Sequence, residues 1–160
     1  MQTTVELLRM GRHDEVWRMY CGFLDLTMAE FMAVQERLLL EQLTLVNNSP
    51  WGKLFFNESR PSTVEEFRQT ARLTRYEDYA PYLDEQREEL LPQKPVTWAH
   101  TSGRSGAYKW APYTQEIFTQ AGHRIVAGFI LAMARRRGEV RLEERDVLVY
   151  NAPARPYSSG

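Results

Sequence analysis

The stretch His100-Thr101-Ser102-Gly103-Arg104-Ser105-Gly106-Ala107-Tyr108-Lys109 organises our interpretation of the whole chain. Two glycines and three hydroxyl residues fall within six of its positions, with one cation inside the turn and another just after it. Because glycine readily takes positive φ angles, successive backbone N–H groups can converge on one point. A concavity of N–H and hydroxyl donors with two cations suits a phosphate group. The pattern therefore predicts an anion-binding loop.

The segments on both sides of this loop predict a hairpin. Residues 95–100 are typical of a short strand that would hold the loop rigidly. Residues 107–110 can form the second arm, which Pro112 would close. We therefore expect a strand, the loop and a second strand in direct succession.

A long apolar helix is expected after the hairpin. Thr114 is a suitable N-cap for it, and Gly138 is a suitable stop. Its apolar side chains recur on one broad face, at Ile117, Phe118, Ala121, Ile125, Phe129 and Met133. Residues 146–150 then predict a further strand.

The first part of the chain is predicted to be helical. Residues 3–20 have a moderate helical pattern, which Gly11 weakens. Thr27 and Glu30 have the spacing of a capping box, so a helix should begin there and run over residues 27–46.

Shorter elements are expected between that helix and the hairpin. Residues 51–53 predict a turn, and Ser62 and Thr63 can cap a short helix that runs through Phe67. Residues 76–90 predict another helix. Its proline, Pro81, leaves two alternatives: a kink at that residue, or a helix that begins later.

These elements together predict an α/β fold, in which a helical N-terminal half is followed by strand, phosphate loop, strand, helix and strand. Residues 1–92 would be mainly helical, and residues 93–160 would carry the strands, the loop and the long helix. We expect residues 1–160 to form one partial domain of a larger protein domain.

Composition excludes several classes of function. With 160 residues, 43% of them hydrophobic, the chain can bury a core. A net charge of −1 gives no basic face for nucleic acid. Cys21 is the only cysteine, which excludes an internal disulfide framework and fits a reducing cytoplasm. The longest apolar run, residues 125–134, is too short to cross a bilayer. We expect a cytoplasmic protein that binds neither nucleic acid nor membrane.

Three familiar loop motifs do not fit the stretch. A Walker A loop needs Gly-Lys-Ser/Thr, whereas Lys109 stands three residues after Gly106. A hydrolase elbow needs Gly-x-Ser-x-Gly, and here the second glycine comes one position early. A dinucleotide fingerprint needs three glycines in set spacing, and the stretch has two.

The stretch does resemble the phosphate loop of adenylate-forming ligases. That pattern is roughly Ser/Thr-Ser-Gly-Thr-Ser/Thr-Gly, two variable residues, then Lys. Six residues fall on it in register: Thr101, Ser102, Gly103, Ser105, Gly106 and Lys109. Arg104 departs from the usual threonine; arginine keeps hydrogen-bond donors and adds charge, but its bulk would reshape the turn.

The flanking sequence is similar to that of the auxin-responsive acyl-acid amido synthetases. Residues 73–82, Leu-Thr-Arg-Tyr-Glu-Asp-Tyr-Ala-Pro-Tyr, resemble a segment that these proteins carry shortly before the same loop. Residues 66–68 and 109–114 are also similar, and Arg72 departs from a common proline. The likeness covers residues 50–157 best, and phenylacetate–CoA ligases match less well. The tyrosines of this segment are expected to be packing residues.

The resemblance implies a function. Such enzymes use ATP with Mg²⁺ to activate a small carboxylic acid as acyl-adenylate, then transfer the acyl group to an amine or thiol. It implies no catalytic residue and no protein metal ligand here, but a phosphate-binding set comprising Thr101, Ser102, Gly103, Arg104, Ser105, Gly106 and Lys109.

Two interpretations of the chain remain open. In the first, it is an N-terminal piece of such a ligase, partnered by the remaining C-terminal part and inactive alone. In the second, it is a non-enzymatic interaction module in which the helices of residues 3–46 bind a partner and the Gly/Ser loop is structural.

Overall fold

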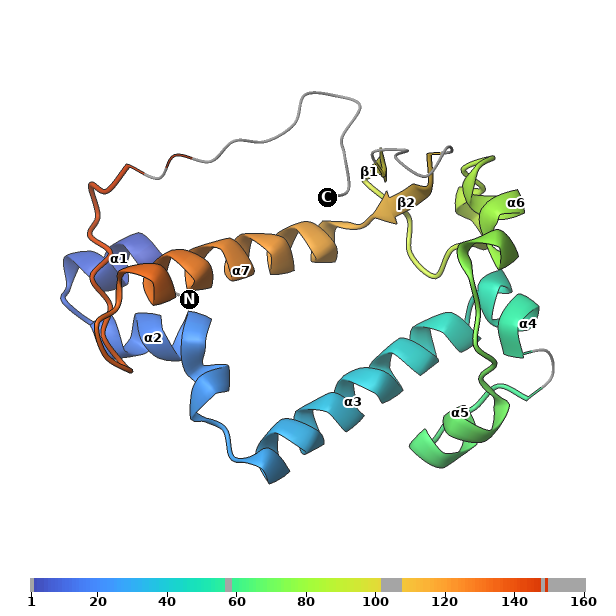
Figure 1. The fold of residues 1–160 in the computed structure, drawn as a ribbon, viewed down its shortest axis with the longest axis horizontal. Coiled ribbons are helices and arrows are strands. Elements are labelled where there is room, and N and C mark those ends of the chain that lie inside the picture. The colour runs from blue at the N-terminus through green and yellow to red at the C-terminus, as the bar shows by residue number, and fades with distance from the viewer. Residues whose placement is uncertain (1, 57–58, 102–107, 148, 150–160) are drawn as a thin grey trace. The chain divides into compact units, whose positions relative to one another are not determined.

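The computed structural model describes residues 2–56, 59–101, 108–147 and 149, and the chain divides into two compact units (Figure 1). One unit is built from residues 2–31 and from the described residues from 116 onward. The other is built from residues 32–115. The described residues are mainly helical with a small two-stranded sheet, which is consistent with the predicted α/β class. The larger architecture and the division at residue 92 stay predictions.

The first unit has a helical core. Its elements are α1 (Thr4–Arg9), α2 (His13–Cys21), the short 3₁₀ helix η1 (Gly22–Asp25) and nearly all of α7 (Gln115–Met133). In Figure 1, α1 and α2 lie alongside the C-terminal part of α7. The buried side chains that pack together are Leu7, Val16, Trp17, Cys21, Ala127, Ile130, Val140 and Leu142.

Two predictions for this unit need correction. The single helix over residues 3–20 is divided, because Gly11 takes a φ of +68° after the end of α1. The long helix ends at Met133, before Gly138, which takes a φ of +83° in the following turn.

The predicted strand over residues 146–150 is wrong for its described residues. Asp146, Val147 and Val149 have no regular structure, and the two valines are 85% and 88% exposed. Residues 148 and 150 lie outside the described part. A strand needs a neighbour to satisfy its backbone groups, and none of the described residues pairs with this segment.

The second unit begins within the longest helix, α3 (Met28–Asn47), whose predicted capping box is confirmed. The Thr27 N–H donates to the Glu30 carboxylate at 2.8 Å, and the Glu30 N–H donates to the Thr27 hydroxyl at 3.3 Å. The predicted turn over residues 51–53 is wrong, because α4 (Pro50–Phe56) occupies it. Proline suits the first helical position, and the Ser49 hydroxyl accepts from the Gly52 N–H.

Of the two helices predicted between α4 and the hairpin, the first is present and the second is divided into shorter pieces. Thr63 caps α5 (Val64–Thr70) as expected, in a box with Glu66. The single helix over residues 76–90 is wrong: three pieces replace it, η2 (Tyr76–Asp78), α6 (Ala80–Leu83) and η3 (Glu88–Leu90). Pro81 lies in the first turn of α6, where its missing N–H costs no helical bond. The proline thus marks a new helix.

The predicted hairpin is confirmed, with its second arm shifted. β1 (Thr97–His100) pairs antiparallel with β2 (Trp110–Tyr113), from Thr97 opposite Tyr113 to His100 opposite Trp110. Tyr108 and Lys109, expected in the second strand, precede it. Pro112 lies inside β2 opposite Trp98, a position that a strand at a sheet edge tolerates.

Within the described residues, no helix has the length and apolar character needed to cross a membrane.

Acid should weaken the helix starts. Three capping glutamates accept backbone N–H bonds, which lower their pKa values; they are Glu6, Glu30 and Glu66. The hydrogen bonds stabilise the charged form of these carboxylates in the folded protein. Their contribution to the free energy of unfolding is therefore present above the unfolded pKa of about 4.3, and it is lost as the pH falls through the lower folded-state pKa values. We expect the free energy of unfolding, from urea titrations, to fall between pH 5 and pH 3. Glu66→Gln should flatten that slope more than Glu65→Gln, which removes a neighbouring charge outside the capping box. If the free energy of unfolding depends equally on pH in the parent protein, Glu66→Gln and Glu65→Gln, this account is contradicted.

Candidate functional site

The hairpin brings the two ends of the predicted phosphate loop together. The Thr101 N–H donates to the Lys109 carbonyl at 3.0 Å, and the Lys109 N–H donates to the Thr101 hydroxyl oxygen at 3.1 Å. Accepting this bond uses a lone pair of the Thr101 oxygen and leaves its O–H a donor. These two hydrogen bonds hold Thr101 and Lys109, the first and last residues of the predicted loop, next to each other.

The middle of the predicted loop falls on residues that the structure does not describe. These are Ser102, Gly103, Arg104, Ser105 and Gly106. Their part in phosphate binding stays a prediction, and the site is built here from Thr101, Lys109 and the residues that contact them.

Tyr76 contacts the side chain of Lys109. The ammonium nitrogen of Lys109 lies 5.3 Å from the centroid of the Tyr76 ring, within the range of a cation–π interaction. Tyr76 opens η2, in the Tyr-Glu-Asp-Tyr segment. That segment therefore lies against the end of the loop.

The hydroxyl of Tyr76 also holds the backbone beside Lys109. It accepts from the Trp110 N–H at 2.8 Å and donates to the Asp84 carboxylate at 2.7 Å. Burial is the main cause that raises the pKa of Tyr76, and the bond to Asp84 adds to it. The phenol therefore stays protonated at neutral pH and remains a donor.

Aromatic rings flank the loop ends on the hairpin itself. The ring of His100 lies 4.6 Å from that of Tyr108 and 5.3 Å from that of Trp110, both edge to face. The Nδ1 atom of His100 lies 2.8 Å from the Thr101 carbonyl oxygen. Because a carbonyl only accepts, Nδ1 carries the proton in this contact. His100 thereby supports the loop entrance.

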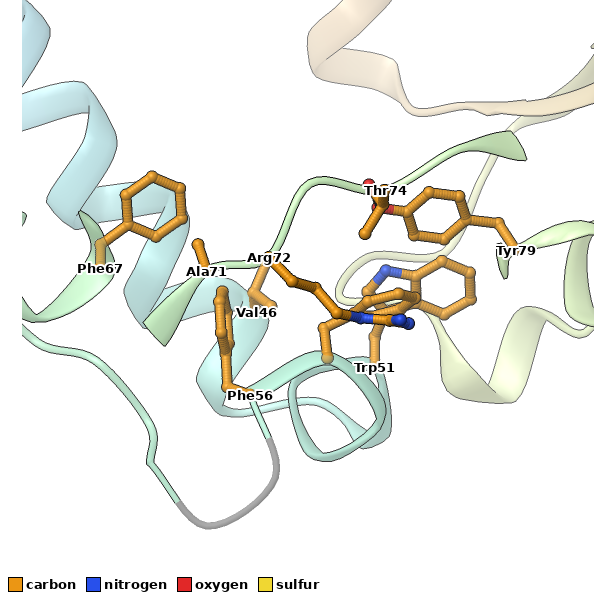
Figure 2. A pocket seen from close by; sticks show the side chains of 9 residues that line it. Val46, Trp51, Phe56, Phe67, Ala71, Arg72, Thr74 and Tyr79 are labelled. Carbon is orange, nitrogen blue, oxygen red and sulfur yellow. Dashed lines mark hydrogen bonds between the residues drawn. The ribbon is translucent and has the colours of Figure 1, made fainter. Parts of the chain in front are cut away.

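A hollow lies where the end of α3, α4 and α5 meet the start of the Tyr-Glu-Asp-Tyr segment (Figure 2). It has a volume of about 270 Å³ and mostly apolar walls, formed by Val46, Trp51, Phe55, Phe56, Phe67 and Ala71, with Arg72, Thr74 and Tyr79. The Trp51 and Tyr79 rings stack at 5.8 Å.

Three polar side chains of this hollow have partners within the chain. The Thr74 and Tyr79 hydroxyls are hydrogen-bonded, and Arg72 lies 3.6 Å from the Asp78 carboxylate. The prediction that the segment's tyrosines pack therefore describes Tyr79, whereas Tyr76 contacts the predicted site.

Sequence reasoning missed Tyr76, Asp84 and Trp110 as neighbours of the loop. Tyr76 and Trp110 are 34 positions apart, so no local pattern joins them. The one sequence feature that could have pointed to Tyr76 was the Tyr-Glu-Asp-Tyr segment, which the resemblance places shortly before the loop. In the described part of the chain, no group of three or more histidine, cysteine, aspartate or glutamate side chains could hold a metal ion.

Comparison with known proteins gives one match. Residues 21–160 match the family model described as the GH3 family N-terminal domain. No curated protein and no solved structure matches the chain. The matched range includes all the residues of the predicted loop and of the Tyr-Glu-Asp-Tyr segment.

Proposed function

The chain belongs to the GH3 family, and from this premise we propose that it binds ATP in an enzyme that activates a carboxylic acid as acyl-adenylate. The GH3 family includes the auxin-responsive acyl-acid amido synthetases, which are adenylate-forming. The acyl group would then pass to an amine or thiol. The observation that carries the proposal is the pairing of Thr101 with Lys109 at the two ends of a Gly/Ser/Thr loop.

The loop would stabilise the phosphates of ATP as pyrophosphate leaves. Negative charge on the β- and γ-phosphates must be neutralised in that step, and preorganised donors achieve this without reorganising at the moment of reaction. The proposed donors are the backbone N–H groups of residues 102–106, the hydroxyls of Thr101, Ser102 and Ser105, and the charged groups of Arg104 and Lys109. Mg²⁺ would accompany ATP, with no protein ligand assigned.

Lys109→Ala should remove most of the stabilisation by nucleotide. A charge-assisted hydrogen bond contributes about 1.5–3 kcal/mol, so its loss should weaken Mg·ATP binding about 10- to 100-fold. A ligand that binds the folded state raises the melting temperature, and a thermal-shift titration with Mg·ATP reports this binding. Lys94→Ala, which removes an exposed lysine of the same unit, is the matched control. An equal nucleotide shift in both variants would contradict the proposed role of Lys109.

Adenylate formation has its own test. Carboxylic acids should promote exchange of labelled pyrophosphate into ATP by the full protein. Exchange that is the same with and without acid would contradict acyl-adenylate formation, even if ATP binds.

A non-enzymatic helical interaction module is the second candidate. It is favoured by apolar side chains that α3 exposes, among them Met28 at 75% and Met32 at 52%. The two candidates separate in the same titration, because a partner-binding module gives no thermal shift at millimolar Mg·ATP.

A further inference from the structure

An ammonium group that is already held near the loop binds a phosphate at a lower cost in conformational entropy than a freely moving one does. A lysine side chain has a flexible four-carbon stem, and a free one samples many rotamers. In this protein the Lys109 ammonium lies over the Tyr76 ring, at 5.3 Å from its centroid. The contact restricts the side chain before any ligand arrives.

Two hydrogen bonds to its hydroxyl hold Tyr76 in place. The hydroxyl accepts one bond, from the Trp110 N–H, and donates one, to Asp84. Trp110 is the residue after Lys109, so the bond from its N–H to Tyr76 holds the backbone beside the lysine. One tyrosine therefore holds the Lys109 side chain through its ring and the adjoining backbone through its hydroxyl.

The group that contacts the Lys109 ammonium decides whether its positive charge stays available to a phosphate. A carboxylate would compete with phosphate for the ammonium, whereas an aromatic face attracts the cation and leaves its charge uncancelled. Among the salt bridges of the described residues, none includes Lys109, and the nearby Asp84 carboxylate accepts from the Tyr76 hydroxyl. The arrangement restrains the ammonium and keeps it available to an anion.

We propose that Tyr76 is a positioning residue, which aims Lys109 at the phosphates of the nucleotide. This inference rests on the proposed ATP-binding function and deepens it. It links the Tyr-Glu-Asp-Tyr segment to the loop through a direct contact. Because Tyr76 acts through Lys109, its contribution to binding should depend on Lys109 being present.

A double-mutant cycle on the full protein tests this dependence, with the Kd for Mg·ATP measured by isothermal titration calorimetry. Tyr76→Leu should weaken binding about two- to fivefold in the parent protein, as expected for an exposed cation–π contact. The same substitution should change Kd by less than about 1.5-fold when Lys109→Ala is already present. A residue that only supports the fold would weaken binding equally in both backgrounds.

Two further variants sharpen the cycle. Tyr76→Phe keeps the ring and should bind Mg·ATP within about twofold of the parent protein, which also gives a measurement if Tyr76→Leu does not fold. Tyr82→Leu removes a tyrosine of the same segment that packs on Trp51, and it should leave Kd unchanged.

The results distinguish a failure of this inference from a failure of the proposed ATP-binding function. A strong loss in Lys109→Ala together with equal effects of Tyr76→Leu in both backgrounds overturns the inference and leaves the proposed function standing. The inference is also overturned if Tyr76→Phe weakens binding as much as Tyr76→Leu does. If Lys109→Ala binds Mg·ATP as tightly as the parent protein, the proposed function is wrong and the inference fails with it.

Discussion

Ile130→Ala should lower the free energy of unfolding by about 3–4 kcal/mol, because it opens a cavity in the buried core of the first unit. The Ile130 side chain is 0% exposed and packs with side chains from α1 and α2. Three buried carbon atoms would lose their contacts, and the neighbouring helices could close the gap only in part. Urea titrations followed by circular dichroism should show a lower midpoint with an unchanged m value.

Leu131→Ala is the matched control for that substitution. Leu131 is the next residue on α7, and it is 40% exposed. Alanine also has a better helix propensity than either side chain, so the comparison isolates burial. We expect a loss below about 1 kcal/mol for Leu131→Ala. Equal losses at the two positions would show that the core of the first unit does not lie where the structure places it.

Gly52→Ala should destabilise the second unit by about 2–4 kcal/mol, although alanine is the better helix former. Gly52 lies in α4, next to the end of α3. A Cβ atom added at Gly52 would lie 2.4 Å from the Val46 carbonyl oxygen and 3.0 Å from the Asn47 Cα. Both are backbone atoms, so the two helices would have to move apart. A fall in the urea midpoint measures the effect.

A glycine-to-alanine substitution is expected to stabilise the protein at a second position, Gly128. At Gly128 in α7, an added Cβ would meet nothing within 4 Å. Gly128→Ala should therefore raise the free energy of unfolding by about 0.5–1 kcal/mol through helix propensity alone. If Gly52→Ala also stabilises the protein, the close approach of α3 and α4 is wrong.

The elements that the sequence predicted well are ones with local signals. The helix starts at Thr27 and Thr63 rest on capping boxes, whose partners are three residues apart and form regardless of the rest of the fold. The short strands around the loop were likewise recognised, with an error of three residues at the second. The Pro50 start of α4 also had a local signal, because proline favours the first helical position, but residues 51–53 were predicted to form a turn and this helix was missed.

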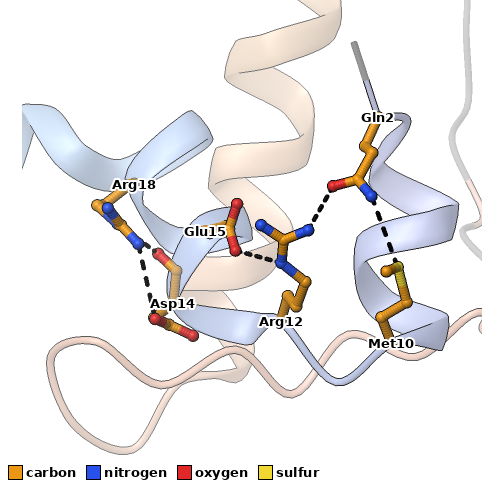
Figure 3. Close-up of polar contacts among 6 residues, drawn as sticks. All are labelled: Gln2, Met10, Arg12, Asp14, Glu15 and Arg18. Carbon is orange, nitrogen blue, oxygen red and sulfur yellow. Dashed lines mark hydrogen bonds and ion pairs between the residues drawn. The ribbon is translucent and has the colours of Figure 1, made fainter.

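The break between α1 and α2 shows where local reasoning was insufficient. Gly11 was recognised as a weak point, but the turn also depends on side chains around it (Figure 3). Arg12 bonds both Glu15 and Gln2, and Gln2 donates to the Met10 sulfur at 3.8 Å. These contacts join the residues that flank α1 to the first turn of α2, which helical periodicity does not reveal.

The hairpin that pairs Thr101 with Lys109 was predictable from the sequence, whereas the contact of Tyr76 with Lys109 was not. Glycine and hydroxyl spacing predicted the loop, and the hairpin confirmed that Thr101 and Lys109 meet. The contact of Tyr76 with Lys109 depends on the path of the chain between them, which includes the three short helical pieces that replaced one predicted helix. Such a contact follows from tertiary structure, so a tyrosine interpreted as packing proved to touch the predicted phosphate-binding lysine.

The central claim is that the loop between Thr101 and Lys109 holds the β- and γ-phosphates of ATP. Its most direct test is the Kd for Mg·ATP and for AMP, measured by calorimetry in the parent protein and in Lys109→Ala. We predict that the parent binds Mg·ATP more tightly than AMP, and that Lys109→Ala weakens Mg·ATP binding about tenfold or more while leaving AMP binding unchanged. Equal affinity of the parent for the two nucleotides, or an unchanged Kd for Mg·ATP in Lys109→Ala, would contradict the account.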